Sequence, residues 1–296
     1  MAATIGNIKE LRARTGAGMV DCKKALEACD DNIEAACDWL REKGISKAAK
    51  KADRIAAEGL TAIASEGNVA SIVEVNAETD FVAKNASFQE LVKNIAKALL
   101  AVKPTTMEEA LAAPMGNGTV NDAVINATAT IGEKISFRRF EIITKEDGDT
   151  FGEYIHMGGK IGVVALIKNM NNEEDAKGVA MHIAASAPQY VSKDEIPADV
   201  IEHERHIQIE TAKTDPKLQG KPEQALVKII DGKVNKHFGE MCLNDQAYVI
   251  DPSLTVGKFL QAKGAHVARF VRFNVGEGMQ KREDDFAKEV MSQMAQ

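Results

Sequence analysis

The first 44 residues place hydrophobic side chains at every third or fourth position, which is the period of amphipathic helices. Gly16 and Gly18 are expected to separate a first helix from a second. Asp31 with Glu34 is predicted to form a capping box that opens a third helix, and Gly44 to end it. Three short helices therefore form a small head, whose repeating apolar positions are Ile5, Ile8, Leu11, Met19, Cys22, Leu26, Cys29, Ile33, Cys37 and Leu40.

The body that follows contains the same order of predicted elements twice. In the first half, Gly59–Ala64 and Val69–Asn76 are predicted to form a hairpin, followed by a helix with its apolar face over Phe88–Leu99. In the second half, Phe151–His156 and Ile161–Ile167 form the hairpin, and a helix again follows. Each half then continues with a further helix and a strand. In the first half, Thr119-Val120 opens the helix and Ile135–Ile142 is the strand. In the second half, Thr255-Val256 opens the helix and Val267–Val275 is the strand. This order predicts an α+β fold with a duplicated core of two small mixed sheets covered by helices.

The second half has a long insertion between its two helices. Residues 187–254 span 68 positions, whereas the corresponding link in the first half, residues 101–118, spans 18. Pro197 begins a charged helical run, Asp215–Pro222 forms a tip, and a second apolar stripe returns from it. Two antiparallel helices joined by a tip make a protruding arm, which is more typical of an interaction element than of a catalytic one.

These patterns divide the chain into four parts. Residues 1–54 are the head and a basic linker, and residues 55–145 are the first half of the core. Residues 146–275 are the second half, with the helical arm inserted at about 193–246. Residues 276–296 are a C-terminal helical module. The cations of the linker, Lys43, Lys47, Lys50, Lys51 and Arg54, are either a solvated face or a contact for an acidic partner.

Composition narrows the class of function. Lys and Arg number 37 against 44 Asp and Glu, a net charge of −7, which argues against a general nucleic-acid binder. Apolar runs such as Ile161–Ile167 are far shorter than the ~20 residues that a membrane helix needs. Met1–Arg14 lacks the pattern of a secretion signal, and the four cysteines fit buried side chains better than a disulfide framework. We expect a cytoplasmic protein.

No set of residues for catalysis is apparent. The chain has no phosphate-binding loop, GxSxG elbow, HExxH motif or paired CxxC. His203, His206 and Glu210 share a helix face with spacing that suits a metal ion, but solvated surface is the preferred interpretation. His156 ends a strand beside a glycine turn and is expected at a hairpin tip, displayed for contact. We expect neither an enzyme nor a bound metal or cofactor.

The segment Asn76–Lys84 joins a buried strand to a helix. Thr79 is suited to the N-cap of that helix, and Asp80 to the positive end of its dipole. Phe81 then has two alternatives. The ring either tucks into the core, or it projects as an apolar anchor beside a charge, which is typical of an interface hot spot.

Five segments, in this order, resemble the bacterial translation elongation factor Ts family, the guanine-nucleotide exchange factors for elongation factor Tu. They are Thr15–Leu26, Lys47–Ala57, Val73–Lys84, Met181–Ala185 and Phe273–Gly278. Together they extend over almost the whole length of the chain.

Two residues depart from the family pattern. Val20 stands where members often have a second methionine, and Ala77 where many have cysteine. Both positions keep a small or apolar side chain.

The resemblance implies a ubiquitin-associated-like three-helix head and a set of partner contacts. It places Asp80 and Phe81 in the G domain of elongation factor Tu near its magnesium ion, within a contact segment Thr79, Asp80, Phe81 and Val82. It places the head on another helix of that domain through Lys9, Arg12, Met19 and Val20, and the second half, with His156, on a different partner domain. The resemblance further implies that binding disturbs the magnesium site and promotes release of GDP from elongation factor Tu until GTP binds.

The implied partner is elongation factor Tu, without direct binding of nucleotide, nucleic acid or membrane by this chain. A homodimer through the arm stays open. So do two other functions: a ribosome-associated or chaperone-like adaptor built on the head and linker, and, more weakly, a metal-dependent enzyme using the arm histidines.

Overall fold

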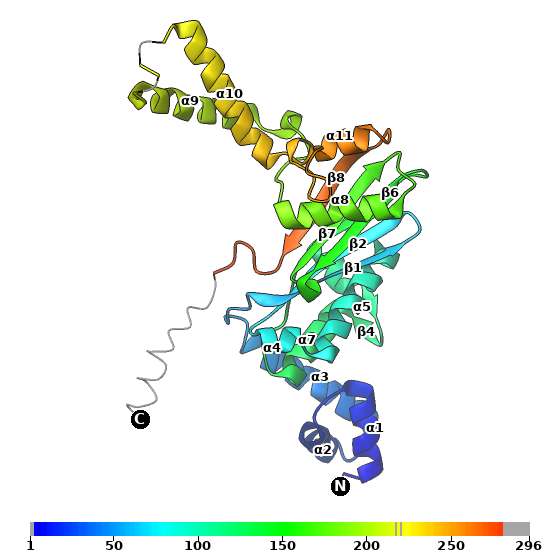
Figure 1. Ribbon diagram of the computed structural model, residues 1–296. Coiled ribbons are helices and arrows are strands. Elements are labelled where there is room, and N and C mark those ends of the chain that lie inside the picture. The colour runs from blue at the N-terminus through cyan, green and yellow to red at the C-terminus, as the bar shows by residue number, and fades with distance from the viewer. Residues whose placement is uncertain (1–2, 217, 220, 281–296) are drawn as a thin grey trace, which may run out of the picture. The chain divides into compact units, whose positions relative to one another are not determined.

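A computed structural model describes residues 3–216, 218–219 and 221–280 (Figure 1). In these ranges it has eleven α-helices and eight strands in three small sheets, which confirms the α+β class. The chain divides into two units. Unit 1 contains residues up to 142 together with 157–161 and the segment from 273, and unit 2 contains residues 143–156 and 162–272. The C-terminal module predicted for 276–296 lies outside the described residues from position 281 onward.

None of the helices in the described ranges has the length and apolar character that a membrane crossing requires.

The head of unit 1 consists of α1 (Ile5–Thr15), α2 (Met19–Ala28) and α3 (Ile33–Ala49). Leu11 and Leu26 are fully buried between these helices. α1 ends at a glycine, Gly16, in the left-handed conformation, as the glycine pattern predicts.

The start of α3 differs from the prediction. Asn32, not Asp31, is the N-cap, and its side chain accepts a hydrogen bond from the Ala35 amide at 3.1 Å. Asp31 has a positive φ of 63° and therefore belongs to the turn before the helix. The predicted capping box of Asp31 and Glu34 was therefore wrong by one position.

The end of α3 also differs from the prediction, because the helix continues through Gly44 to Ala49. A Cβ atom placed on Gly44 would lie 3.6 Å from the Ala129 side chain of α7 (Val120–Ile131). Gly44 is buried inside α3, where a Cβ would make only an ordinary contact with α7, and it does not terminate the helix. The first part of the basic linker is consequently helical.

The sheet of unit 1 has the order β1-β2-β5, with β1 at Glu58–Glu66, β2 at Val69–Ala77 and β5 at Ser136–Thr144. β1 and β2 form the predicted antiparallel hairpin, with Glu58 opposite Ala77 and Glu66 opposite Val69. The elements that follow β2 are α4 (Asp80–Ala83), α5 (Ala86–Val102), α6 (Met107–Ala112), β3 (Pro114–Met115), β4 (Gly118–Thr119) and α7. The sequence did not predict the two-residue strands β3 and β4.

The central strand β2 is buried along its whole length. Val73, Val75 and Ala77 belong to the apolar cluster that also contains the buried side chains of α5 and α7. Side chains alternate across a strand, so Glu74 and Asn76 lie on the opposite face. This polar face is the setting of the site described below.

The sheet associated with unit 2 has the order β6-β7-β8, with β6 at Thr150–His156, β7 at Ile161–Lys168 and β8 at His266–Asn274. β6 and β7 are joined by a 3-10 turn, η1 (Met157–Gly159). In unit 2, α8 (Glu173–Ser186) packs against β6. The helix α11 (Val256–Gln261) begins where the sequence predicts, with Thr255 as its N-cap.

The arm of unit 2 is an antiparallel pair of helices, α9 (Ala198–Thr214) and α10 (Glu223–Met241) (Figure 1). Its seam buries Ala212, Ile230, Val234 and Phe238. The short 3-10 turns η2 (Lys193–Glu195) and η3 (Leu243–Asp245) lie at its base.

His182 on α8 is fully buried and takes part in two hydrogen bonds. Its Nδ1 accepts from the Val249 amide at 3.2 Å, so its Nε2 carries the proton and donates to Gln246 Oε1 at 2.9 Å. Burial lowers the pKa of His182, and the Gln246 hydrogen bond offsets this only in part. The folded protein therefore keeps this ring neutral.

We predict that the free energy of unfolding decreases as the pH falls below about 6.5, because the unfolded state then binds a proton that folded His182 does not. Urea unfolding between pH 5 and 8 measures this dependence. A His182→Gln variant is expected to be less stable but to show a weaker dependence on pH in this range. Identical pH slopes for the two proteins would contradict the assignment.

Candidate functional site

A sharp corner connects β2 to the one-turn helix α4. Thr79 is the N-cap of α4, and its hydroxyl oxygen accepts a hydrogen bond from the Val82 amide at 3.4 Å. Val82 and Ala83 are buried, so they attach the helix to the core of unit 1. The corner thus holds the residues between them in a fixed orientation.

Phe81 projects from this corner. Its side chain is 78% exposed, the highest fraction among the large hydrophobic side chains of the described residues. The ammonium of Lys84 lies 5.8 Å from the ring centroid and 2.6 Å from Asp80 Oδ2. The hydrogen bond from Lys84, with a further contribution from the charge of Lys160, lowers the pKa of Asp80. Of the two alternatives, the structure therefore shows the projecting ring, beside an ionised carboxylate.

The loop between α7 and β5 contacts the corner from one side. The Glu133 carboxylate accepts hydrogen bonds from the Thr79 amide at 3.0 Å and from the Thr79 hydroxyl at 2.7 Å. In the opposite direction, the Glu78 carboxylate accepts a hydrogen bond from the Lys134 amide at 2.6 Å. It also forms an ion pair with Arg54 at 3.2 Å. No local pattern in the sequence indicated these contacts, because the partners are 24 residues apart for Arg54 and Glu78 and more than fifty apart for the others.

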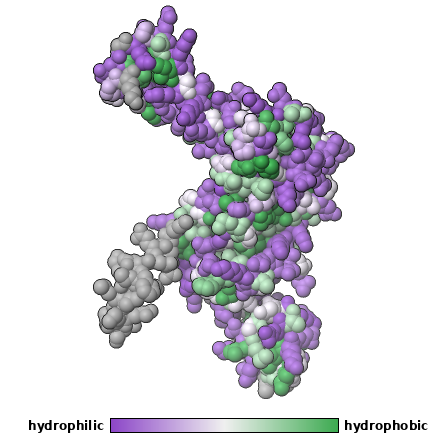
Figure 2. All heavy atoms as spheres, in the orientation of Figure 1, coloured by the Kyte–Doolittle hydropathy of each residue, from purple (hydrophilic) through white to green (hydrophobic). Residues whose placement is uncertain are grey.

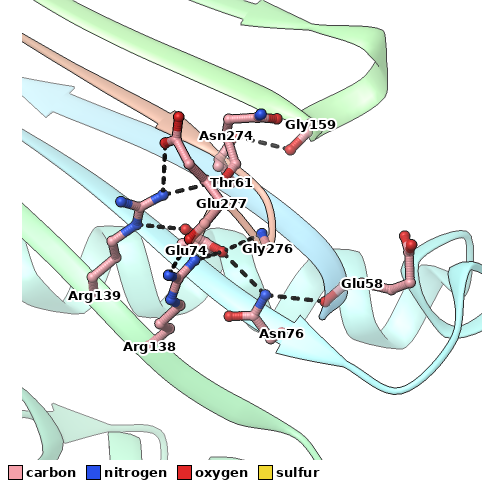
Figure 3. Close-up of polar contacts among 10 residues, drawn as sticks. All are labelled: Glu58, Thr61, Glu74, Asn76, Arg138, Arg139, Gly159, Asn274, Gly276 and Glu277. Carbon is pink, nitrogen blue, oxygen red and sulfur yellow. Dashed lines mark hydrogen bonds and ion pairs between the residues drawn. The ribbon is translucent and has the colours of Figure 1, made fainter. Parts of the chain in front are cut away.

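Behind the corner, β2 carries a carboxylate with no exposure to solvent, Glu74 (Figure 3). It accepts hydrogen bonds from Arg138 Nη1 at 2.9 Å, Arg139 Nε at 2.6 Å, the Gly276 amide at 2.9 Å and Asn76 Nδ2 at 3.1 Å. Burial alone would raise the pKa of Glu74, but the hydrogen bonds from Gly276 and the two arginines hold it below its ordinary value. Glu74 is therefore ionised.

The same network attaches the segment from Phe273 to Glu277. Arg138 donates to the Glu277 carbonyl, and Arg139 donates to the Asn274 carbonyl at 3.1 Å (Figure 3). Gly276 has a φ of 73°, and a Cβ atom there would lie 2.2 Å from the Ala57 carbonyl oxygen. Only glycine fits this position. The sequence offered one clue to the network, an acid in the middle of an apolar strand.

The turn after β6 is attached to β1. The Thr61 hydroxyl donates to the Gly159 carbonyl at 2.9 Å, and Lys160 forms an ion pair with Glu58. Met157 at this turn is 71% exposed and has a positive φ of 49°. The preceding residue, His156, is half-buried in unit 2, with Nδ1 3.2 Å from the Tyr154 hydroxyl.

The predicted contact residues of the head are all accessible. Lys9 and Arg12 are exposed on α1, and Met19 and Val20 are 55% and 66% exposed at the start of α2. Figure 2 shows apolar surface on the head, the lower part of the chain in that view. Val82 differs from these residues because it is buried, so its side chain supports the corner.

The histidines of the arm do not assemble a metal site. Over the described ranges, no group of three or more His, Cys, Asp or Glu side chains is placed to hold a metal ion. Glu210 instead pairs with Lys213 at 2.6 Å, and this hydrogen bond lowers its pKa.

An exposed aromatic ring on a rigid corner, flanked by charges, is the arrangement that is typical of an interface hot spot. A model of the family described as "Elongation factor TS" matches residues 78–277, which is more than half of the chain. The chain belongs to this family. Members of the family act in translation elongation as nucleotide exchange factors for elongation factor Tu, and an exchange factor is not an enzyme in the usual sense. The match begins at the corner itself, so the head and the β1–β2 hairpin lie outside it.

The buried charge of Glu74 gives a test of what holds this site together. We predict that Glu74→Gln lowers the free energy of unfolding by roughly 3 kcal/mol, because it leaves two arginines without their anionic partner. Urea unfolding at pH 7 measures the change. The matched control is Glu66→Gln at the exposed hairpin turn, with an expected change within about 0.5 kcal/mol. Equal effects of the two substitutions would contradict the role given to Glu74.

Proposed function

We propose that this protein releases GDP from elongation factor Tu by inserting Phe81, with Asp80 beside it, into the G domain near the bound magnesium ion. The observation that supports this most strongly is the 78% exposure of a ring whose backbone is fixed on both sides. An exposed apolar side chain on rigid backbone loses little conformational entropy on binding, which is characteristic of a hot spot.

The effect on the partner follows from the coordination chemistry of magnesium. Mg²⁺ requires a near-octahedral shell of oxygen ligands at about 2.1 Å, so a small displacement of its ligands weakens the nucleotide site. By thermodynamic linkage, nucleotide weakens the binding of this protein by the same factor. The complex with both ligands is therefore short-lived, and exchange ends when GTP binds. No covalent step is needed.

Further contacts supply the free energy that offsets the lost nucleotide contacts. On the head, Lys9 and Arg12 offer two cations, and Met19 and Val20 offer exposed apolar surface for another helix of the G domain. We assign His156 to a contact with a second partner domain. Thr79 and Val82 position Phe81.

We further propose the finer architecture: a ubiquitin-associated-like head, a core of two duplicated halves, an inserted arm and a C-terminal module, with the boundaries given above. The common order of strands in the β1-β2-β5 and β6-β7-β8 sheets supports the duplication. Exposed apolar positions on the arm, Val200, Ile207 and Val227, are the surface through which two copies would pair.

We predict that Phe81→Ala reduces the stimulated rate of GDP release by about 30-fold, equivalent to about 2 kcal/mol of transition-state stabilisation. The measurement uses elongation factor Tu preloaded with fluorescent GDP and catalytic amounts of this protein. Val102→Ala, at an exposed apolar position near the end of α5, is the control and is expected to match the wild type.

Stimulation by Phe81→Ala at the wild-type level would remove this ring from the mechanism. Absence of stimulation by the wild-type protein itself would favour the adaptor function instead.

A further inference from the structure

The helix that carries Phe81 is too short to be stable by itself. α4 has four residues, and the first turn of a helix is entropically costly to form. Its stability therefore depends on its cap and on the two buried residues at its end.

A capping box normally satisfies such a helix start in two ways. The N-cap hydroxyl accepts from the amide at N3, and an acidic side chain at N3 accepts from the N-cap amide. In α4 the N-cap is Thr79, but the N3 residue is Val82, which has no acceptor. The second half of the box has to come from elsewhere.

Glu133 provides it from the other end of the first half of the core. One carboxylate oxygen accepts from the Thr79 amide at 3.0 Å, and this donor is 54 residues away in sequence. The other oxygen accepts the Thr79 hydroxyl proton at 2.7 Å. Because the hydroxyl has only one proton, donating it to Glu133 directs a lone pair toward the Val82 amide, which lies 3.4 Å away.

The base of Glu133 is itself fixed. The amide of the next residue, Lys134, donates to Glu78 at 2.6 Å, and the Lys134 ammonium donates to the carbonyls of Ala52 at 2.6 Å and Arg54 at 3.0 Å. The loop is thereby attached to the strand end on one side and to the linker on the other. Glu133 meets Thr79 from a rigid support.

We propose that Glu133 is a positioning residue for nucleotide exchange, acting through Thr79 to hold the helix that presents Phe81. This inference rests on the proposed exchange function. Glu133 need not touch the partner. Its carboxylate already restricts the corner in the free protein, so less conformational entropy is lost when the ring inserts. GDP release is thereby accelerated.

The test compares Glu133→Gln with Glu66→Gln, which removes the same charge at the far end of the hairpin, roughly 26 Å along β2 from the corner. The glutamine has one acceptor oxygen in place of two, so one Thr79 donor loses its partner. We expect GDP release at a saturating concentration of this protein to slow about tenfold, the usual consequence of losing one hydrogen bond to a charged group. Glu66→Gln is expected to behave as the wild type.

Two readouts separate positioning from a general structural role. Hydrogen exchange of the Val82 amide is expected to accelerate in Glu133→Gln, while the core amide of Leu99 stays protected. In a Phe81→Ala background, Glu133→Gln is expected to have no further effect on GDP release, because the ring to be positioned is absent.

Unchanged release in Glu133→Gln, or a full tenfold loss repeated in the Phe81→Ala background, would overturn the positioning role. Wild-type release by Phe81→Ala alone would instead overturn the proposed exchange mechanism. The Val82 exchange rate still shows in that case whether Glu133 holds the corner, so the two failures are distinguishable.

Discussion

Glu74 has no access to water, so the protein must supply every hydrogen bond that keeps its carboxylate ionised. Its partners are two arginines of β5, Asn76 of its own strand and the Gly276 amide, which is 202 residues away in sequence. This one charge therefore joins the central strand, its neighbour and the segment after β8 within unit 1. Because β2 leads directly into the corner, the position of Phe81 depends on that strand being fixed.

The corner combines a rigid backbone with an apolar side chain whose burial contributes little to the stability of the fold. Burying a phenylalanine stabilises a protein by about 1.5–3 kcal/mol, and the 78% exposed ring of Phe81 gives up most of that. Backbone hydrogen bonds on both sides of the ring, through Val82 and Glu133, maintain the arrangement. The proposed function gives the reason, because elongation factor Tu would bury the ring in the complex.

Much of the fold could be predicted from local patterns. Apolar periodicity predicted the helices of the head, α5, the arm and both hairpins, but not α6, which lies in the stretch expected to be a link. The N-caps Thr79 and Thr119 follow from short-range chemistry that the sequence displays directly. Gly44 was misleading because, in the sequence, a glycine inside a helix has the same local appearance as one that ends a helix.

The hydrogen bonds that hold the corner in place could not be predicted from local patterns, for a different physical reason. Glu74 and Glu133 act on segments distant in sequence, and the hydrophobic pattern marks β2 as buried without showing which donors face its polar side. The exposed state of Phe81 also needed the structure, since a capped helix start is compatible with a ring that points inward or outward.

The central claim is that the Phe81 ring acts on the magnesium site of elongation factor Tu. The most direct measurement compares GDP release stimulated by the wild-type protein and by Phe81→Ala, first in magnesium and then in excess chelator. The account predicts a large ratio of the two rates in magnesium and a ratio close to one after its removal. A ratio that does not change when magnesium is removed would contradict the account.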